Sequence, residues 1–86
     1  MNFKVVGHYI DFGKRMINID CITDISFDRY IRLYFPRKYG NLDIHKESDG
    51  SRCDSYDILL SDEDYDKFEI YLRTELPLRR RSSFEF

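Results

Sequence analysis

Apolar and polar positions alternate through the first two thirds of the chain, which is typical of β-strands with one buried face. Residues 3–12 are mostly apolar and predict a first strand, bent or bulged at Gly7. A turn is expected at residues 13–14. Residues 15–20 and 22–27 then alternate in different phases, so a bulge or short corner is expected around residues 20–21.

The clearest strand covers residues 29–35. Ile31, Leu33 and Phe35 take alternate positions, and we assign them to the core. The opposite face then carries Tyr30, Arg32 and Tyr34. Such strict alternation is typical of an antiparallel strand with one side in contact with solvent. Residues 36–41 contain proline and glycine and predict a turn.

The next segment predicts a short strand over residues 42–44, with Asp43 and His45 directed outward. Residues 46–55 are polar and include an Asp-Gly-Ser sequence, which predicts a surface loop or the tip of a hairpin. Residues 56–60 are apolar and predict the last strand.

A helix is predicted from Ser61 by several independent signals. The sequence Ser-Asp-Glu-Asp at 61–64 resembles a capping box, and its three acids complement the helix dipole. Apolar residues then follow helical spacing and predict a buried stripe: Tyr65, Phe68, Leu72 and Leu76. Pro77 disfavours helical geometry in the preceding residue, so the helix is expected to end before it.

Together these elements predict an α+β protein: a five- to six-stranded curled antiparallel sheet or small barrel, followed by one C-terminal helix at about residues 61–76. With 86 residues, we expect one domain over residues 1–76 and a basic, aromatic tail over 77–86. The chain contains neither a long apolar run nor a signal-peptide pattern. Cys21 and Cys53 are interpreted as reduced thiols, and a cytoplasmic location is expected.

Two patterns resemble known proteins. Strands followed by a final helix are similar to pleckstrin-homology-like small barrels, where the helix covers an open end. The stretch Ile-Asn-Ile-Asp-Cys-Ile-Thr-Asp-Ile at 17–25, with the Leu-Ser-Asp-Glu-Asp-Tyr helix start at 60–65, looks like a loose group of small bacterial proteins, many without an assigned activity. This resemblance implies a fold more than a function. The lipid-binding use of that fold would need a basic loop, where this chain has only Lys14 and Arg15.

Charge is divided unevenly although the net charge is only −2. Residues 29–38 carry four basic side chains and no acidic side chain. Residues 41–69 hold ten acids against three bases, a net charge of −7. Complementary patches of this kind suit contact with a partner or with another copy of the chain, or they are simply solvated faces.

The sequence carries no recognised catalytic signature. His8 and His45 are the only histidines, and pairing either of them with a cysteine would be needed for a thiol nucleophile. A metal site formed by Asp49, Asp54 and Asp57 does not match the EF-hand pattern. We therefore expect no enzyme activity, no metal and no cofactor.

The candidate binding residues are tyrosines and basic residues around the clearest strand. They are Tyr30, Arg32, Tyr34, Arg37, Lys38 and Tyr39, to which the tail adds Arg79, Arg80 and Arg81. Tyrosine and arginine are favoured at protein interfaces, so the sequence predicts a small interaction module, a bacterial or phage regulator or inhibitor that forms homo-oligomers. The alternative is a single-stranded nucleic-acid-binding protein that stacks bases on the same face, although the sequence pI is near 5.6.

Overall fold

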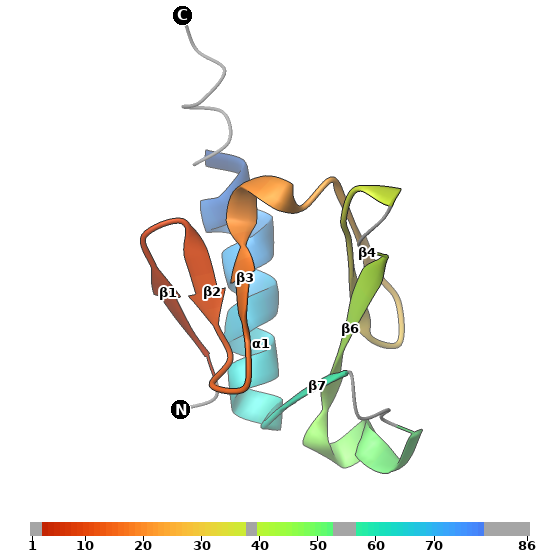
Figure 1. Ribbon diagram of the computed structural model, residues 1–86. Helices are drawn as coiled ribbons and strands as arrows, with labels where there is room; N and C mark the ends of the chain where they lie inside the picture. Colours follow the sequence, from red (N-terminus) through yellow and green to blue (C-terminus); the bar gives the residue numbers. More distant parts are fainter. Residues whose placement is uncertain (1–2, 38–39, 53–56, 79–86) are drawn as a thin grey trace, which may run out of the picture.

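The computed structural model describes residues 3–37, 40–52 and 57–78. These residues form two open sheets and a C-terminal helix (Figure 1). The strands are β1 (Lys4–Val6), β2 (Tyr9–Asp11), β3 (Met16–Asn18), β4 (Asp24–Phe27), β5 (Ile31–Tyr34), β6 (Asn41–Lys46) and β7 (Ile58–Leu60). The helix α1 (Asp62–Ile70) continues into a π-helical turn, η4 (Tyr71–Glu75).

The strands divide into a three-stranded sheet, β1-β2-β3, and a four-stranded sheet, β4-β5-β6-β7. In Figure 1 the two sheets stand on either side of a gap, and α1 runs beside the three-stranded sheet. The 3₁₀ turn η1 (Ile19–Cys21) connects them and confirms the corner expected there. The α+β class is thus confirmed, but the described strands form no barrel, because β3 and β4 separate at this corner instead of pairing.

The first predicted strand is instead a hairpin. Residues 3–12 hold β1 and β2, which pair antiparallel around a two-residue turn from Val6 to Tyr9. Gly7 has φ +61°, and a positive φ at the first turn residue is what a type II′ hairpin turn requires. The glycine therefore reverses the chain, where the sequence predicted a bend or a bulge within one strand.

The antiparallel strands β4, β5 and β6 follow the predicted phase. Ile31 pairs with Ile44, and Leu33 pairs with Leu42, so the apolar side chains of β5 and β6 share one face. All four are buried, with at most 4% of their surface exposed. The assignment of the alternate positions of β5 to the core is confirmed.

The last strand pairs in a direction that the sequence did not predict. β7 lies parallel to β6, with Ile44 opposite Ile58 and Lys46 opposite Leu60. A parallel pair needs a crossover instead of a hairpin, and η3 (Glu47–Arg52) forms the described part of that connection. The fully antiparallel sheet and the hairpin at 46–55 are therefore wrong.

The helix begins as predicted and ends later. Ser61 is the N-cap, and its hydroxyl accepts a hydrogen bond from the backbone N–H of Asp64 at 3.1 Å. Helical geometry continues through Pro77 to Leu78, so the expected end before Pro77 is wrong. The wide turn η4, in which the Leu76 N–H donates to the carbonyl of Tyr71, relieves the clash that a proline ring makes with an α-helical carbonyl.

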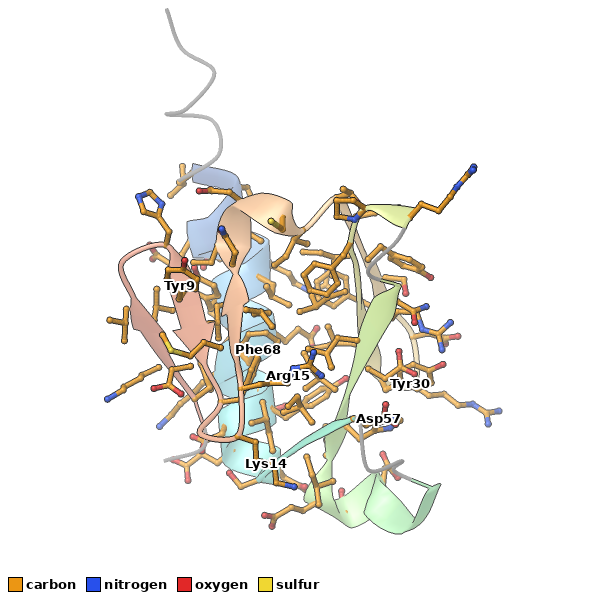
Figure 2. All side chains as sticks on the ribbon, viewed as in Figure 1. Tyr9, Lys14, Arg15, Tyr30, Asp57 and Phe68 are labelled. Carbon is orange, nitrogen blue, oxygen red and sulfur yellow. The ribbon has the colours of Figure 1, made fainter. Side chains whose placement is uncertain are left out.

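Phe68 of α1 is fully buried and belongs to the core cluster, to which residues of both sheets contribute (Figure 2). Its ring makes edge contacts with Phe3 and Phe12 from the three-stranded sheet side, at centroid distances of 5.1 and 5.5 Å. The predicted helical stripe is confirmed: Tyr65, Phe68, Leu72 and Leu76 are all buried. Among the described residues, no helix is both long and apolar enough to cross a membrane.

Candidate functional site: the outer face of the four-stranded sheet

The core covers only one side of the four-stranded sheet. The strand registers place alternate residues on the opposite side, which we call the outer face. The registers assign to the outer face Asp24, Ser26, Arg32, Tyr34, Asn41, Asp43, His45 and Leu59. Tyr30 and Asp57 join it through their contacts with Arg32 and His45. Figure 2 shows Tyr30 and Asp57 on this side, with the four-stranded sheet between them and Phe68.

Arg32 is the best-anchored side chain of the outer face. It lies directly opposite Asp43, and its Nε and Nη2 donate to the two carboxylate oxygens at 2.7 and 3.0 Å. Nη2 also donates to the Tyr30 hydroxyl at 2.8 Å. The hydrogen bonds to Asp43 raise the pKa of Arg32 above its ordinary value, so the guanidinium remains charged.

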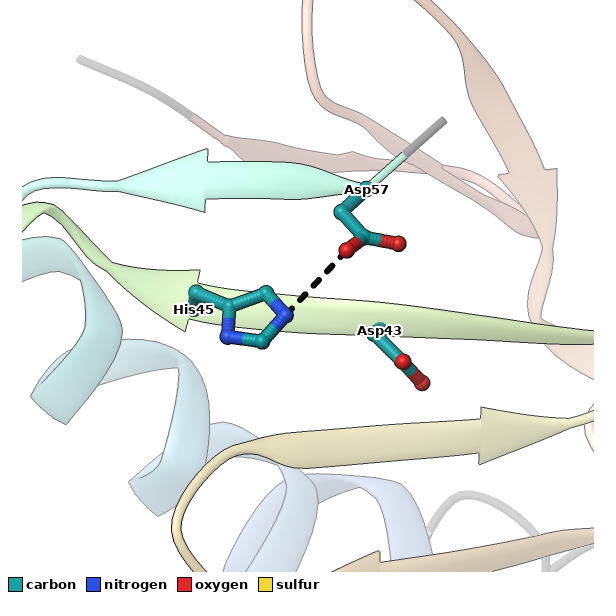
Figure 3. Close-up of side chains that lie close together, drawn as sticks. All are labelled: Asp43, His45 and Asp57. Atoms are coloured by element: carbon teal, nitrogen blue, oxygen red, sulfur yellow. Dashed lines mark ion pairs between the residues drawn. The ribbon is translucent and has the colours of Figure 1, made fainter. Parts of the chain in front are cut away.

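His45 forms a second polar pair beside the first. Its Nε2 lies 3.3 Å from Oδ2 of Asp57, which immediately precedes β7 (Figure 3). The Tyr30 ring packs against the imidazole at a centroid distance of 4.7 Å. The side chains of His45 and Asp57 are only 13% and 17% exposed, so this pair is fixed in the sheet surface instead of moving freely in water.

The two pairs are neighbours, because Asp43 and His45 are alternate residues of β6. Asp43, His45 and Asp57 each offer one nitrogen or oxygen atom that could ligate a metal ion, and these three atoms lie within 4.8 Å of one another. Figure 3 shows Asp43 and His45 extending from β6, and Asp57 reaching toward His45 from the start of β7. The result is a continuous polar cluster of Tyr30, Arg32, Asp43, His45 and Asp57.

The predicted binding residues are only partly brought together. Tyr30, Arg32 and Tyr34 share the outer face and are each half-buried. Arg37 is exposed beyond the end of β5. Lys38, Tyr39, Arg79, Arg80 and Arg81 lie outside the described residues.

The sequence pointed to three further members of the cluster separately but did not bring them together. Asp43 and His45 were placed outward by alternation, but alternation does not reveal that Asp43 pairs with Arg32 across the strands. From the sequence, Asp57 was considered with Asp49 and Asp54, of which Asp54 lies outside the described residues, whereas the parallel pairing of β7 with β6 brings Asp57 to His45. A histidine two residues after an aspartate on a strand was the one available signal.

The basic and acidic segments that the sequence predicts partly neutralise each other within the chain. Arg32 belongs to the basic segment and Asp43 to the acidic one, and they pair across β5 and β6. The outer face as a whole carries three carboxylates, at Asp24, Asp43 and Asp57, against the single guanidinium of Arg32. It is therefore not a basic surface.

A cavity of about 240 Å³ is a separate feature, located between the sheets. Ile17 and Cys21 line it from the three-stranded side, and Phe35 and Leu42 from the other. Arg15 and two asparagines form the polar part of the lining. The cavity does not include any residue of the polar cluster.

Comparison with protein-family models, with curated proteins and with solved structures finds no match for this chain. The resemblance to pleckstrin-homology-like proteins accordingly stays a prediction.

Proposed function

We propose that this protein is a small non-enzymatic binding module that recognises a protein partner, in the first instance a second copy of itself, through the outer face. The observation that carries the proposal is the fixed position of Arg32, held by three hydrogen bonds to Asp43 and Tyr30. An arginine and tyrosines held in place before contact lose little side-chain entropy on binding. Tyrosine and arginine are also the residues that most often dominate the free energy of protein association.

The open sheets support self-association. Among the residues that the structure describes, β4 and β7 each end the four-stranded sheet and have a strand on one side only. Unpaired strand edges are common sites for adding a strand from another chain. Leu59 on β7 is 42% exposed and adds an apolar side chain to the outer face.

Charge weighs against the nucleic-acid alternative. A surface that stacks single-stranded nucleic acid needs cations that are free to contact phosphates. The one guanidinium of the outer face already binds Asp43, and two further carboxylates lie on the same face. Anisotropy of labelled single-stranded DNA and RNA at low and physiological salt tests this alternative, and salt-sensitive binding would favour it.

The main experiment compares two tyrosines in sedimentation velocity over a series of protein concentrations. Tyr34→Ala changes the outer face, whereas Tyr9→Ala makes the same change on the three-stranded sheet, where Tyr9 is 44% exposed. We expect the wild type to self-associate, and Tyr34→Ala to weaken this association by about tenfold or more. Tyr9→Ala should leave it unchanged.

Two results would contradict the proposal. A wild type that remains monomeric at every concentration would exclude self-association. A dimer that Tyr9→Ala disrupts, and Tyr34→Ala does not, would place the interface on the other sheet. Far-UV circular dichroism of both variants confirms that the fold is kept.

A further inference from the structure

We propose that Asp43, His45 and Asp57 form a binding site for a divalent transition-metal ion. Their three ligand atoms lie within 4.8 Å of one another on the outer face. Such a site is independent of the proposed function, because it lies within a single chain and needs no partner.

The distances suit a common ion. Zinc lies about 2.0–2.2 Å from histidine nitrogen and carboxylate oxygen, so two ligands of one ion are separated by about 3–3.5 Å. His45 Nε2 and Asp57 Oδ2 are already 3.3 Å apart. Asp43 projects from β6 on the same side as His45, and one of its oxygens already lies within 4.8 Å of the ligand atoms of His45 and Asp57.

The surroundings hold the ligands in place. Asp43 and His45 belong to β6, and Asp57 adjoins β7, which is paired with β6 by backbone hydrogen bonds. Tyr30 packs against the His45 ring and limits its rotation. The three side chains are between 13% and 18% exposed, so they are accessible to an ion but shielded from bulk water.

The donor set selects a class of ion. One imidazole nitrogen with two carboxylate oxygens suits zinc, manganese, cobalt or iron in the divalent state. Magnesium and calcium prefer oxygen donors alone, and copper in the monovalent state prefers sulfur. Three protein ligands also leave at least one position for water or for a donor from another molecule.

Arg32 is compatible with the site and moderates its charge. Its guanidinium donates to both oxygens of Asp43, and each oxygen keeps a second lone pair for an ion. Metal-ligating carboxylates are commonly hydrogen-bonded in this way, which fixes their orientation. With two carboxylates, one guanidinium and neutral His45, the cluster has a net charge of −1 before an ion binds.

The chain supplies its own matched control. His8 and Asp20 form a second histidine–aspartate pair, also 3.3 Å apart, but their side chains are 70% and 62% exposed. No third donor from the described residues joins them. If a histidine–aspartate pair alone were sufficient, both pairs would bind.

The first test is calorimetric titration of the full chain with zinc chloride, after removal of metals by a chelator. We expect one ion per chain. His45→Ala should weaken binding by more than about 100-fold, because loss of even an outer partner of a ligand costs about 10–100-fold in affinity. His8→Ala should bind as the wild type does.

The second test needs no variant and so does not depend on folding of His45→Ala. His8 and His45 are the only histidines, so NMR has two imidazole rings to follow. Manganese added in small amounts should broaden the His45 signals much more than those of His8. Zinc affinity that His45→Ala leaves unchanged, stronger broadening of His8, or no binding of zinc and manganese at all would overturn the site.

Discussion

Arg32 and Asp62 show how contacts at the scale of single residues depend on partners distant in sequence. Arg32 lies in a segment whose sequence predicts an exposed, positively charged surface. In the structure it lies opposite Asp43 and forms an ion pair with it. Asp62 reads only as a helix-start acid. In the structure its Oδ1 also accepts a hydrogen bond from the backbone N–H of Ser48, 3.2 Å away.

The Asp62 contact predicts a pH dependence of stability. The hydrogen bonds from Ser48 lower the pKa of Asp62 in the folded state. The folded state therefore favours the ionised carboxylate, and its contribution is present at neutral pH and lost as the pH falls through this lowered pKa. Urea unfolding at several pH values should find the wild type more stable than Asp62→Asn at neutral pH, with the difference vanishing in acid.

A second variant checks the cause of this shift. Ser48→Ala removes the hydroxyl, which is the largest cause of the lowered pKa, and keeps the backbone N–H. An NMR titration should find the pKa of Asp62 closer to its ordinary value in Ser48→Ala. A difference between wild type and Asp62→Asn that persists unchanged into strong acid would contradict this account.

At the scale of elements, the sequence was most informative where the signal is local. Alternation predicted β5 and its buried face, and Ser61 with the following acids predicted the start of α1. It failed where two readings of one residue compete. A glycine at position 7 is compatible with a bend within a strand or with a hairpin turn. Pro77 predicts the end of a helix, although η4 accommodates it in a wide turn.

The role assigned to Gly7 makes a prediction for the first hairpin. Gly7→Ala should lower the free energy of unfolding by about 1–2 kcal/mol, because a residue with a Cβ is strained at positive φ. A Cβ at this position would meet no atom within 4 Å, so the loss comes from the backbone alone. Urea unfolding measures it.

Asparagine provides the control at Gly7. It tolerates positive φ better than other residues with a side chain, so Gly7→Asn should lose less stability than Gly7→Ala. Equal stability of the wild type and Gly7→Ala would mean that the turn does not need positive φ.

At the scale of the whole molecule, one helix packs in the same hydrophobic core as both sheets. Phe68 contacts Phe3 and Phe12 on one side, and it belongs to the same buried cluster as the apolar residues of β5, β6 and β7. An 86-residue chain has only a small core, so a side chain shared by both sheets contributes much of the total stability.

Phe68→Ala is therefore expected to be among the most destabilising changes in the chain. Truncation of a fully buried phenylalanine costs about 3–5 kcal/mol. Ile70→Ala, on the exposed side of the same helix and 61% accessible, should change stability by less than about 0.5 kcal/mol. Urea unfolding followed by far-UV circular dichroism compares them.

An intermediate variant keeps this prediction measurable. If Phe68→Ala is too unstable to study, Phe68→Leu should lie between it and the wild type, since it retains part of the volume. Similar losses for Phe68→Ala and Ile70→Ala would show that the helix does not join the two sheets through Phe68.

The sequence by itself determined the α+β class, the buried face of β5 and the N-terminus of the helix, because each follows from spacing or from contacts within a few residues. The tertiary structure alone decided the division into two sheets, the parallel pairing of β7 and the meeting of Asp43, His45 and Asp57. These features depend on which strands pair. An identical pattern of apolar residues allows either direction for β7, and only one of them brings Asp57 to His45.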